Sequence, residues 1–205
     1  MSSQLALPAR PLPDATAVPI RPAKLAHVVL RVSDLARSRA WYRCLLEASV
    51  AFENEMVCFL SYDEEHHRLG LIGRPDLAGL RSDDALPGLE HVAFTYATLG
   101  ELLATWRRLQ ALEITPYWCI NHGPTISLYY KDPDGNRVEL QYDVFASAQE
   151  VQAFFDSGAY AENFMGIRFD PAALAARFEA GEALDALTRR PPLPAGATPW
   201  DMHLA

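Results

Sequence analysis

The sequence contains the same order of predicted elements twice. Residues 25–32 (LAHVVLRV) and 89–96 (LEHVAFTY) resemble each other, and each opens a unit of strand, helix and three further strands. An internal repeat of this kind predicts two copies of one supersecondary unit. We therefore predict an α+β fold of paired βαβββ modules, at about residues 25–72 and 88–143.

Each module is predicted to hold one helix with an apolar side. In the first module, Ser33 or Asp34 caps a helix that runs to about Glu47. In the second module, the helix covers residues 99–112. The predicted strands are residues 25–32, 50–52, 56–62 and 68–72 in the first module, and 89–95, 114–120, 127–130 and 138–142 in the second.

The chain also has two flanking segments. Residues 1–22 are rich in Pro and Ala without a periodic apolar pattern, which predicts a flexible or extended arm. Residues 23–145 are expected to form a single domain. Residues 146–205 form a helical and Pro-rich tail, with helices predicted at 148–155 and 170–180 and an irregular chain from residue 189. We predict no chemistry in the tail, which is expected to pack against the sheet or a partner chain.

Composition and charge argue against several classes of partner. The chain has 205 residues, 50% hydrophobic and 21% charged, which suits a globular protein with a real core. Its net charge of −8 argues against a nucleic-acid partner, which requires a basic patch. No apolar run is long enough to span a membrane, and the first residues lack the order of a signal peptide. The chain has three cysteines, and they follow no CxxC pattern. Such a small, odd number is typical of proteins in the reducing cytoplasm and argues against a disulfide framework.

Residues 121–142 (NHGPTISLYYKDPDGNRVELQY) predict a strand, a tight turn and a second strand. The turn is residues 132–135 (DPDG), where proline presets φ and glycine supplies a positive φ. In the second strand, Glu139 lies between Val138 and Leu140, so a carboxylate occupies a segment otherwise suited to burial. A buried carboxylate is costly unless it is paired or bound to metal. Taken alone, however, a glutamate is more often exposed.

Two histidines, His27 and His91, occupy matching positions in the two repeats. A single histidine in a strand is more often structural than a metal ligand. Two at equivalent positions, together with Glu139, favour a metal site. Two imidazoles and one carboxylate make the facial triad of non-haem Fe(2+), which leaves open positions for substrate and oxygen, and Mn(2+) accepts the same ligands.

These residues resemble the signature of type I extradiol ring-cleaving dioxygenases, which belong to the vicinal oxygen chelate superfamily. The signature has a histidine, a short gap, an apolar residue followed by tyrosine, then Asp-Pro-x-Gly and a nearby glutamate. Here His122, Leu128, Tyr129, the DPDG turn and Glu139 follow in that order. The resemblance covers roughly residues 24–145, and the tail is similar to that of one-domain, biphenyl-diol-type members.

The resemblance implies a half-open barrel around one metal site. It makes His27, His91 and Glu139 the metal ligands, with Fe(2+) as the expected metal. It also implies an extradiol dioxygenase that takes a catechol and O2 and cleaves the aromatic ring next to the diol. One pair of modules leaves sheet edges exposed, so we expect a homodimer or higher homo-oligomer.

The resemblance implies catalytic roles for three further residues. His122 corresponds to a histidine near substrate and bound oxygen, and Tyr129 to a tyrosine that hydrogen-bonds the metal-bound catecholate. Residues 63–69 (DEEHHRL) resemble a paired-histidine segment whose second histidine transfers a proton, which assigns that role to His67.

The direction of the paired histidines is a separate expectation. Alternation of His67 with Leu69 and Leu71 is compatible with a His67 side chain that points into the barrel, and His66 would then face the other way. By the same reasoning, Tyr130 points away from Tyr129 and should lie in the core or an interface.

Two other functions remain open on the same fold. A glyoxalase-type isomerase would need a fourth protein ligand on the last strand of the first module, where residues 68–72 (RLGLI) offer no carboxylate or amide. A metal-free small-molecule binding protein would not need the three ligand types. The catechol itself is not identified by the sequence, although Phe59, Trp118 and Ile120 are candidates for lining a pocket.

Overall fold

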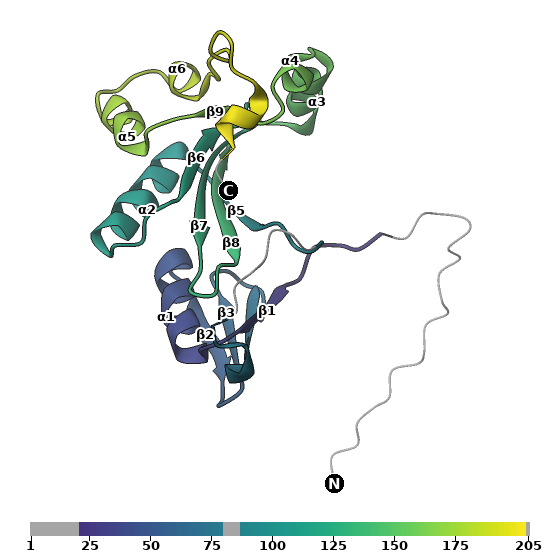
Figure 1. The fold of residues 1–205 in the computed structure, drawn as a ribbon, viewed down its shortest axis with the longest axis vertical. Helices are drawn as coiled ribbons and strands as arrows, with labels where there is room; N and C mark the ends of the chain where they lie inside the picture. The colour runs from purple at the N-terminus through teal and green to yellow at the C-terminus, as the bar shows by residue number, and fades with distance from the viewer. Residues whose placement is uncertain (1–20, 80–86, 204–205) are drawn as a thin grey trace, which may run out of the picture.

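Figure 1 shows the computed structural model of the chain, which describes residues 21–79 and 87–203. The first module has its helix and strands in the predicted order. Almost all of the predicted N-terminal arm, residues 1–22, lies outside the described residues. The elements of this module are β1 (Val28–Val32), α1 (Leu35–Leu46), β2 (Ser49–Glu53), β3 (Val57–Ser61) and β4 (Leu69–Gly73), followed by a 3-10 turn, η1 (Pro75–Leu77).

The second module repeats this order. Its helix begins at a capping box, in which Thr98 accepts from the backbone of Glu101 and the Glu101 side chain accepts from Thr98. The first helix begins after Asp34, which accepts from the backbone N–H of Arg37, as predicted. The elements of the second module are β5 (Val92–Tyr96), α2 (Leu99–Ala111), β6 (Trp118–Asn121), β7 (Thr125–Lys131) and β8 (Arg137–Asp143).

Three predicted strands start at least three residues later than expected: β1 begins at Val28 rather than residue 25, β5 at Val92 rather than residue 89, and β6 at Trp118 rather than residue 114. The backbone N–H of Ile114 donates to the Leu109 carbonyl at 2.9 Å, so this residue lies in the turn that closes the C-terminal end of α2. Pro116 then has no N–H to offer a sheet.

Each module forms its own mixed sheet. Sheet A has the strand order β1-β4-β3-β2, and sheet B has the order β5-β8-β7-β6-β9. In both sheets the first strand of the module pairs in parallel with its last strand, and the other pairs are antiparallel. This matching topology confirms the predicted pair of βαβββ modules. The described strands do not close into a barrel, because β1 and β5 each end a sheet and do not pair with each other.

The two helices cover one face of each sheet. In Figure 1, α1 and α2 lie on the same side of the molecule, each beside the sheet of its own module. One continuous cluster of buried side chains joins them, and Tyr130 is fully buried in it, as predicted. The strand residues of this core include Leu30, Val32, Leu69, Leu71, Leu128, Val138 and Leu140.

The opposite face of each sheet, which we call the site face, carries the residues of interest. Residues directly paired across strands point to the same face. On sheet A, Val29, Gly70 and Phe59 are paired in this way. On sheet B, one row across four strands consists of Ala93, Glu139, Tyr129 and Trp118.

The DPDG turn joins the two modules. Tyr42 of α1 is 1% exposed, and its hydroxyl donates to Asp132 Oδ2 at 3.0 Å. The backbone N–H of Ser33 donates to Asp134 at 2.9 Å, and the Ser33 hydroxyl bonds the same carboxylate. Gly135 takes a φ of 89°, as the predicted turn requires. The turn therefore fixes the end of sheet B against the start of α1.

A second contact joins the modules through the helices. The guanidinium of Arg108 in α2 donates to the carbonyls of Cys44 and Leu45 near the end of α1. Helix ends leave carbonyls without an intrahelical partner, and a cation at this end also suits the helix dipole. The two modules are thus held at both ends of α1.

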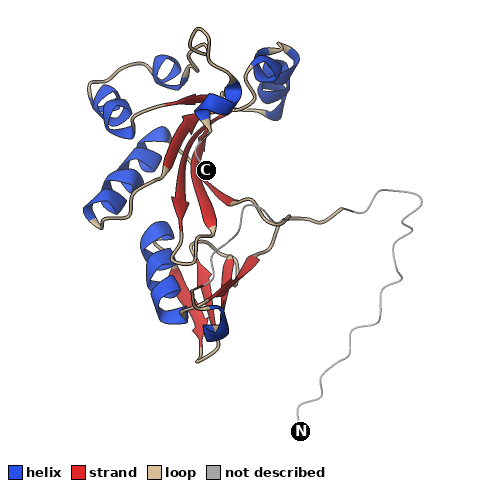
Figure 2. Cartoon of the chain, in the orientation of Figure 1, coloured by secondary structure: helices blue, strands red, loops and turns tan. Residues whose placement is uncertain are grey.

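The tail folds back over sheet B, as Figure 2 shows. Its short strand β9 (Ile167–Arg168) pairs with β6 and covers that edge. Gly166 precedes it with a φ of 109°, and an added Cβ would lie 2.4 Å from the Asn121 carbonyl oxygen, so only glycine fits there. The remaining elements are α3 (Ala148–Asp156), α4 (Ala159–Glu162), α5 (Pro171–Glu179), α6 (Leu184–Thr188) and η2 (Pro199–Met202).

Both predicted tail helices are present, as α3 and α5, but the chain beyond residue 189 is more ordered than predicted. Trp118 donates through Nε1 to the Met202 carbonyl at 2.9 Å, and Met202 is buried. Part of the site face of sheet B is therefore covered by the end of the tail. No helix in the described part of the chain is long and apolar enough to cross a membrane.

Candidate metal centre and substrate pocket

Two of the predicted metal ligands meet on sheet B. His91 lies just before β5, and Glu139 lies in β8, which pairs with β5. The distance from His91 Nε2 to Glu139 Oε2 is 3.1 Å. The parallel pairing of these strands explains the contact, since it sets the start of β5 beside the start of β8, with Val92 opposite Val138. We call His91 and Glu139, with their neighbours Tyr129 and His122, the sheet B half-site.

Glu139 is a buried carboxylate that stays ionised. It is 4% exposed. Burial alone would raise its pKa, but hydrogen bonds from His91 and Ser127 hold the pKa of Glu139 below its ordinary value. The same hydrogen bond raises the pKa of His91. A buried negative charge with an imidazole beside it is an arrangement that a divalent cation can occupy.

Tyr129 and His122 form a hydrogen-bonded pair in this half-site. His122 Nδ1 donates to the Met165 carbonyl at 2.5 Å, so the proton of the neutral ring sits on Nδ1. His122 Nε2 is then an acceptor, 3.1 Å from the Tyr129 hydroxyl. Burial lowers the pKa of His122, and burial together with the charge of Glu139 raises the pKa of Tyr129. The result is a neutral base beside a protonated phenol.

The third predicted ligand, His27, lies with two other histidines at sheet A. Its ring stacks on His67 at 4.3 Å between centroids, and His67 stacks in turn on Phe59 at 4.4 Å. His66 joins the group, with its Nδ1 2.6 Å from His67 Nδ1. One ligand atom from each of His27, His66 and His67 can be chosen so that all lie within 4.8 Å of one another. We call His27, His67 and Phe59 the sheet A half-site.

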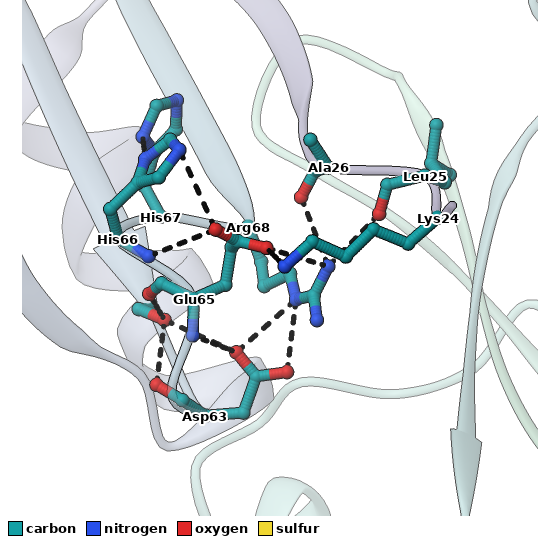
Figure 3. A network of polar contacts seen from close by, with 9 residues as sticks. Lys24, Leu25, Ala26, Asp63, Glu65, His66, His67 and Arg68 are labelled. Atoms are coloured by element: carbon teal, nitrogen blue, oxygen red, sulfur yellow. Dashed lines mark hydrogen bonds and ion pairs between the residues drawn. The ribbon is translucent and has the colours of Figure 1, made fainter. Parts of the chain in front are cut away.

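A polar network holds the sheet A half-site together, as Figure 3 shows. Arg68 donates to both carboxylate oxygens of Asp63, at 3.2 and 2.9 Å. The same guanidinium donates to the carbonyls of Leu25 and Ala26, at 2.9 and 3.1 Å. Arg68 therefore ties the chain just before His27 to the bend that carries the paired histidines.

The expected alternation of the paired histidines is wrong. Leu69 and Leu71 are in the helix-side core, whereas the ring of His67 packs on the site face beside Phe59. His66 does not face the opposite way either, because its ring centroid lies 4.5 Å from that of His67. The reason is that both histidines precede β4, where strand alternation does not yet apply.

The structure leaves the three predicted ligands in two groups. In the described residues, the cluster of three histidines at sheet A is the one set of three His, Cys, Asp or Glu side chains close enough to share an ion. The ligand atoms of His27, His91 and Glu139 do not all lie within 4.8 Å of one another. Gly70 lies on the site face of β4 beside Val29 and Phe59, so this position of the strand offers no fourth ligand.

An aromatic wall stands next to Tyr129. The ring centroid of Trp118 lies 4.7 Å from that of Tyr129 and 5.7 Å from that of His122. The ring centroid of His203, at the end of the described tail, lies 5.4 Å from that of Trp118 in an edge-on arrangement. Trp118 and Ile120 thus lie in a second apolar cluster with Met202, as candidates for a pocket wall.

Several residues of the site were not identified from the sequence. Ser127 bonds Glu139, and its alternation with Ile126 and Leu128 could have placed it on that face. Arg190 donates to the His122 carbonyl at 2.9 Å and to the Asn163 carbonyl at 2.7 Å. No local pattern signals Arg190, because its partners are distant in sequence.

Comparison with known proteins agrees with this fold and these residues. A family model described as the Glyoxalase/Bleomycin resistance protein/Dioxygenase superfamily matches residues 24–140, which span both modules. The protein belongs to this superfamily. The match confirms the family resemblance that the signature predicted.

Two relatives match this chain in sequence over most of its length. The chain is 42% identical over 165 residues to biphenyl-2,3-diol 1,2-dioxygenase 2 of Rhodococcus globerulus, covering 80% of this chain and 86% of that protein. It is also 42% identical over 167 residues to biphenyl-2,3-diol 1,2-dioxygenase 3 of that organism, covering 82% and 88%. A crystal structure of a glyoxylase/bleomycin resistance protein/dioxygenase domain from Frankia sp. EAN1pec superposes with a TM-score of 0.52 at 20% identity, over 60% of this chain and 99% of that one, which supports the fold.

Proposed function

We propose that the protein is an extradiol dioxygenase, which uses O2 to cleave the aromatic ring of a catechol next to its diol. The observation that carries this proposal is the sheet B half-site, where an ionised buried carboxylate and an imidazole lie beside the Tyr129–His122 pair. The names of the two Rhodococcus globerulus relatives support the same reaction and a dihydroxylated biphenyl as substrate.

The metal proposed for this site is one divalent ion held by His27, His91 and Glu139. The donor set fits, because two imidazoles and a carboxylate suit a first-row metal and leave neighbouring positions for the two oxygens of a catechol. Fe(2+) is the proposed metal, and Mn(2+) is the alternative. When bound, the metal supplies the chelation and redox chemistry that brings catechol and dioxygen together.

Residues of sheet B are proposed to handle protons around the substrate. His122 presents a neutral Nε2, so it can accept a proton or donate one back at a developing negative charge. Tyr129 keeps its proton because its pKa is raised, so its hydroxyl can donate to a catecholate oxygen. Met165 contributes by fixing the His122 tautomer through its backbone carbonyl.

His67 is the proposed acceptor for the first catechol proton. Burial and the neighbouring imidazoles of His27 and His66 lower its pKa, so it is neutral near pH 7. Its ring is also held in place, between Phe59 and His27. A fixed, neutral imidazole next to a metal ligand has the properties that a general base requires.

The substrate is proposed to be an aromatic diol with a further apolar group. The ring of Trp118 beside Tyr129 offers a flat surface for an aromatic substrate, and the indole N–H of Trp118 donates to the Met202 carbonyl, which fixes the ring. The reaction consumes one O2 per catechol. The carbon–carbon bond next to the diol breaks, and both oxygen atoms enter the ring-opened product.

The protein is also proposed to act as a homodimer or higher oligomer in the cytoplasm. β1 and β5 are unpaired at one edge in the described residues, and exposed edges are usually covered. Val29 and Phe52 on sheet A are 45% and 51% exposed, which adds apolar surface to be buried. Cys44, Cys58 and Cys119 are free thiols, as is usual in a reducing compartment.

Anaerobic reconstitution tests the proposed reaction. The protein is loaded with Fe(2+) or Mn(2+), and O2 uptake is followed with biphenyl-2,3-diol and with unsubstituted catechol. The expected result is uptake of O2 in step with formation of a coloured, ring-opened product. Glu139→Gln is the matched control, because it keeps the side-chain volume and loses the charge, and it should lose most of the activity. Metal-loaded protein that consumes no O2 with any catechol would contradict the proposal.

A further inference from the structure

The tail, for which the sequence predicts no chemistry, holds the loop that carries His122. His122 comes directly after β6, and its Nδ1 donates to the carbonyl of Met165 in the tail. That hydrogen bond decides which ring nitrogen carries the proton, so it also decides whether Nε2 meets Tyr129 as an acceptor. The groups that fix the Met165 carbonyl and the His122 backbone therefore fix the form of the imidazole.

The bend that presents the Met165 carbonyl is closed by Asn163. The Asn163 side chain is buried, accepts from the backbone N–H of Gly166 at 3.0 Å and donates to the Gly166 carbonyl at 2.9 Å. Gly166 in turn lies against the His122 backbone, where an added Cβ would be 2.9 Å from the His122 Cα. Met165 lies between these two fixed residues, so the direction of its carbonyl follows from the place of Asn163.

Arg190 joins this bend to the His122 loop. Its Nη1 donates to the His122 carbonyl at 2.9 Å and to the Asn163 carbonyl at 2.7 Å. Its Nη2 donates to the Ala159 carbonyl at 2.7 Å. One guanidinium therefore bonds both the residue that carries the imidazole and the residue that closes the bend. Such a set of contacts suits the rigid, planar fork of donors that arginine has and lysine lacks.

The surroundings of Arg190 leave its carbonyl contacts as its main polar interactions. In the part of the chain that the structure describes, its hydrogen-bond acceptors are these three carbonyls. Its guanidinium lies over the ring of Phe154 at 5.1 Å, and the same ring covers Gly123, where an added Cβ would lie 2.5 Å from Phe154 Cζ. Partial burial lowers the pKa of Arg190, and a cation that loses water is costly unless it is hydrogen-bonded. Removing the guanidinium would free three backbone carbonyls at once.

We propose that Arg190 is a positioning residue, which holds His122 in the tautomer and the place that proton transfer requires. This inference rests on the proposed function of His122, and it specifies how the tail contributes to that function. Arg190 acts through the His122 backbone and through the bend that carries Met165, and it keeps its own proton throughout. A residue that only closed the tail would change stability and leave the state of the His122 ring unchanged.

Nitrogen NMR of the His122 ring tests the positioning without any reaction. Full-length protein with ¹⁵N-labelled histidine and no added metal is studied at about pH 8, where a histidine is neutral. The His122 signals are assigned by their loss in His122→Asn. In the wild type, Nδ1 should be protonated and Nε2 unprotonated. Arg190→Met should give a mixture of both tautomers, and Arg190→Lys should keep more of the wild-type form, because an ammonium can still donate to part of the carbonyls.

Two controls separate positioning from a loss of stability. Arg189 is the neighbouring arginine, and its side chain is 75% exposed, so Arg189→Met should leave the His122 signals and the melting temperature unchanged. Phe178 of α5 packs against Gly100 of α2, so Phe178→Ala should lower the melting temperature and leave the His122 signals unchanged. A wild-type tautomer in Arg190→Met would overturn the inference, and so would the same loss of tautomer in Phe178→Ala.

Kinetics of the iron-loaded enzyme test whether the effect passes through His122. Arg190→Met should lower kcat by roughly 10- to 100-fold with little change in KM, because a small displacement of a catalytic group can cost about 10²-fold in rate. His122→Asn alone should lower kcat by roughly 10²- to 10⁴-fold. The double variant should be no slower than His122→Asn, because residues that act as one unit are not additive. A double variant slowed by the product of both factors would overturn the inference.

The two kinds of measurement separate failure of this inference from failure of the proposed function. If the wild type cleaved no catechol but Arg190→Met still lost the His122 tautomer, the positioning role would stand and the dioxygenase would be contradicted. If Arg190→Met cleaved catechols at the wild-type rate, the positioning role would be overturned and the dioxygenase would stand.

Discussion

Tyr42 offers the sharpest test of how the two modules are joined. The change Tyr42→Phe removes one hydroxyl and keeps the ring that packs in the core. That hydroxyl donates to Asp132 Oδ2 at 3.0 Å, between groups that are almost fully buried. A hydrogen bond to a charged group is worth about 1.5–3 kcal/mol in proteins.

The expected loss lies at the lower end of that range. Asp132 keeps three other donors, the backbone N–H groups of Asp134 and Asn136 and the Asn136 side chain, at 2.9, 2.8 and 2.8 Å. Its charge is therefore not left without partners. We expect a decrease in the free energy of unfolding of about 1.5–2 kcal/mol. For a chain of this size the melting temperature should fall by roughly 3–8 °C.

Urea unfolding of the wild type and the variant measures this difference. Tyr62→Phe is the matched control, because Tyr62 is 48% exposed, and it should change stability by less than about 0.5 kcal/mol. If Tyr42→Phe also changed stability by less than about 0.5 kcal/mol, the buried contact between the modules would not be the constraint that we describe.

The same pair of proteins gives a pH dependence with a definite sign. Burial raises the pKa of Tyr42 well above 10.0, and the charge of Asp132 raises it further. When folding raises the pKa of a group, that group contributes its full share to the free energy of unfolding below the pKa of the unfolded state. The contribution is lost as the pH rises through the pKa of the folded state. The stability difference between the wild type and Tyr42→Phe should therefore be constant up to about pH 9.5 and shrink above pH 10. A difference that grew with pH would refute the assignment.

Three further predictions concern the half-sites. His67→Ala should retain iron but slow ring cleavage by roughly 10²- to 10⁴-fold, and His66→Ala should have a milder effect. If both variants lost the same steady-state rate, His67 would not be the single general base. Arg68→Ala should weaken iron affinity by roughly 10- to 100-fold in a competition titration with a chelator, because it frees the segment before His27, and unchanged affinity would show that this anchor is dispensable. Trp118→Leu should raise KM for biphenyl-2,3-diol up to roughly tenfold while kcat changes little, and a loss confined to kcat would remove Trp118 from the pocket wall.

Features that depend on local chemistry could be predicted from the sequence. Asp34 caps α1 and the DPDG turn forms as expected, because capping and turn geometry depend on residues a few positions apart. The similarity of residues 25–32 and 89–96, each at the start of a unit, predicted both modules. The contact of His91 with Glu139 also follows, since it needs only the pairing of two strands within one module.

Features that depend on distant contacts could not be predicted. The modules are placed by the bond between Tyr42 and Asp132, which are 90 residues apart, and no local pattern encodes that contact. The position of His27 relative to Glu139 follows from it. The tail is a similar case, because Met202 reaches Trp118 across 84 residues. Alternation failed for His67 because the strand had not yet begun.

The proposed reaction requires this chain to insert both atoms of O2 into a catechol, next to the diol. The most direct test is one turnover of the iron-loaded protein with biphenyl-2,3-diol under ¹⁸O2, with the product analysed by mass spectrometry. We predict that the product gains both labelled atoms and is opened beside the diol rather than between its two oxygen-bearing carbons. A product opened between those carbons, or one that carries no label, would contradict the account.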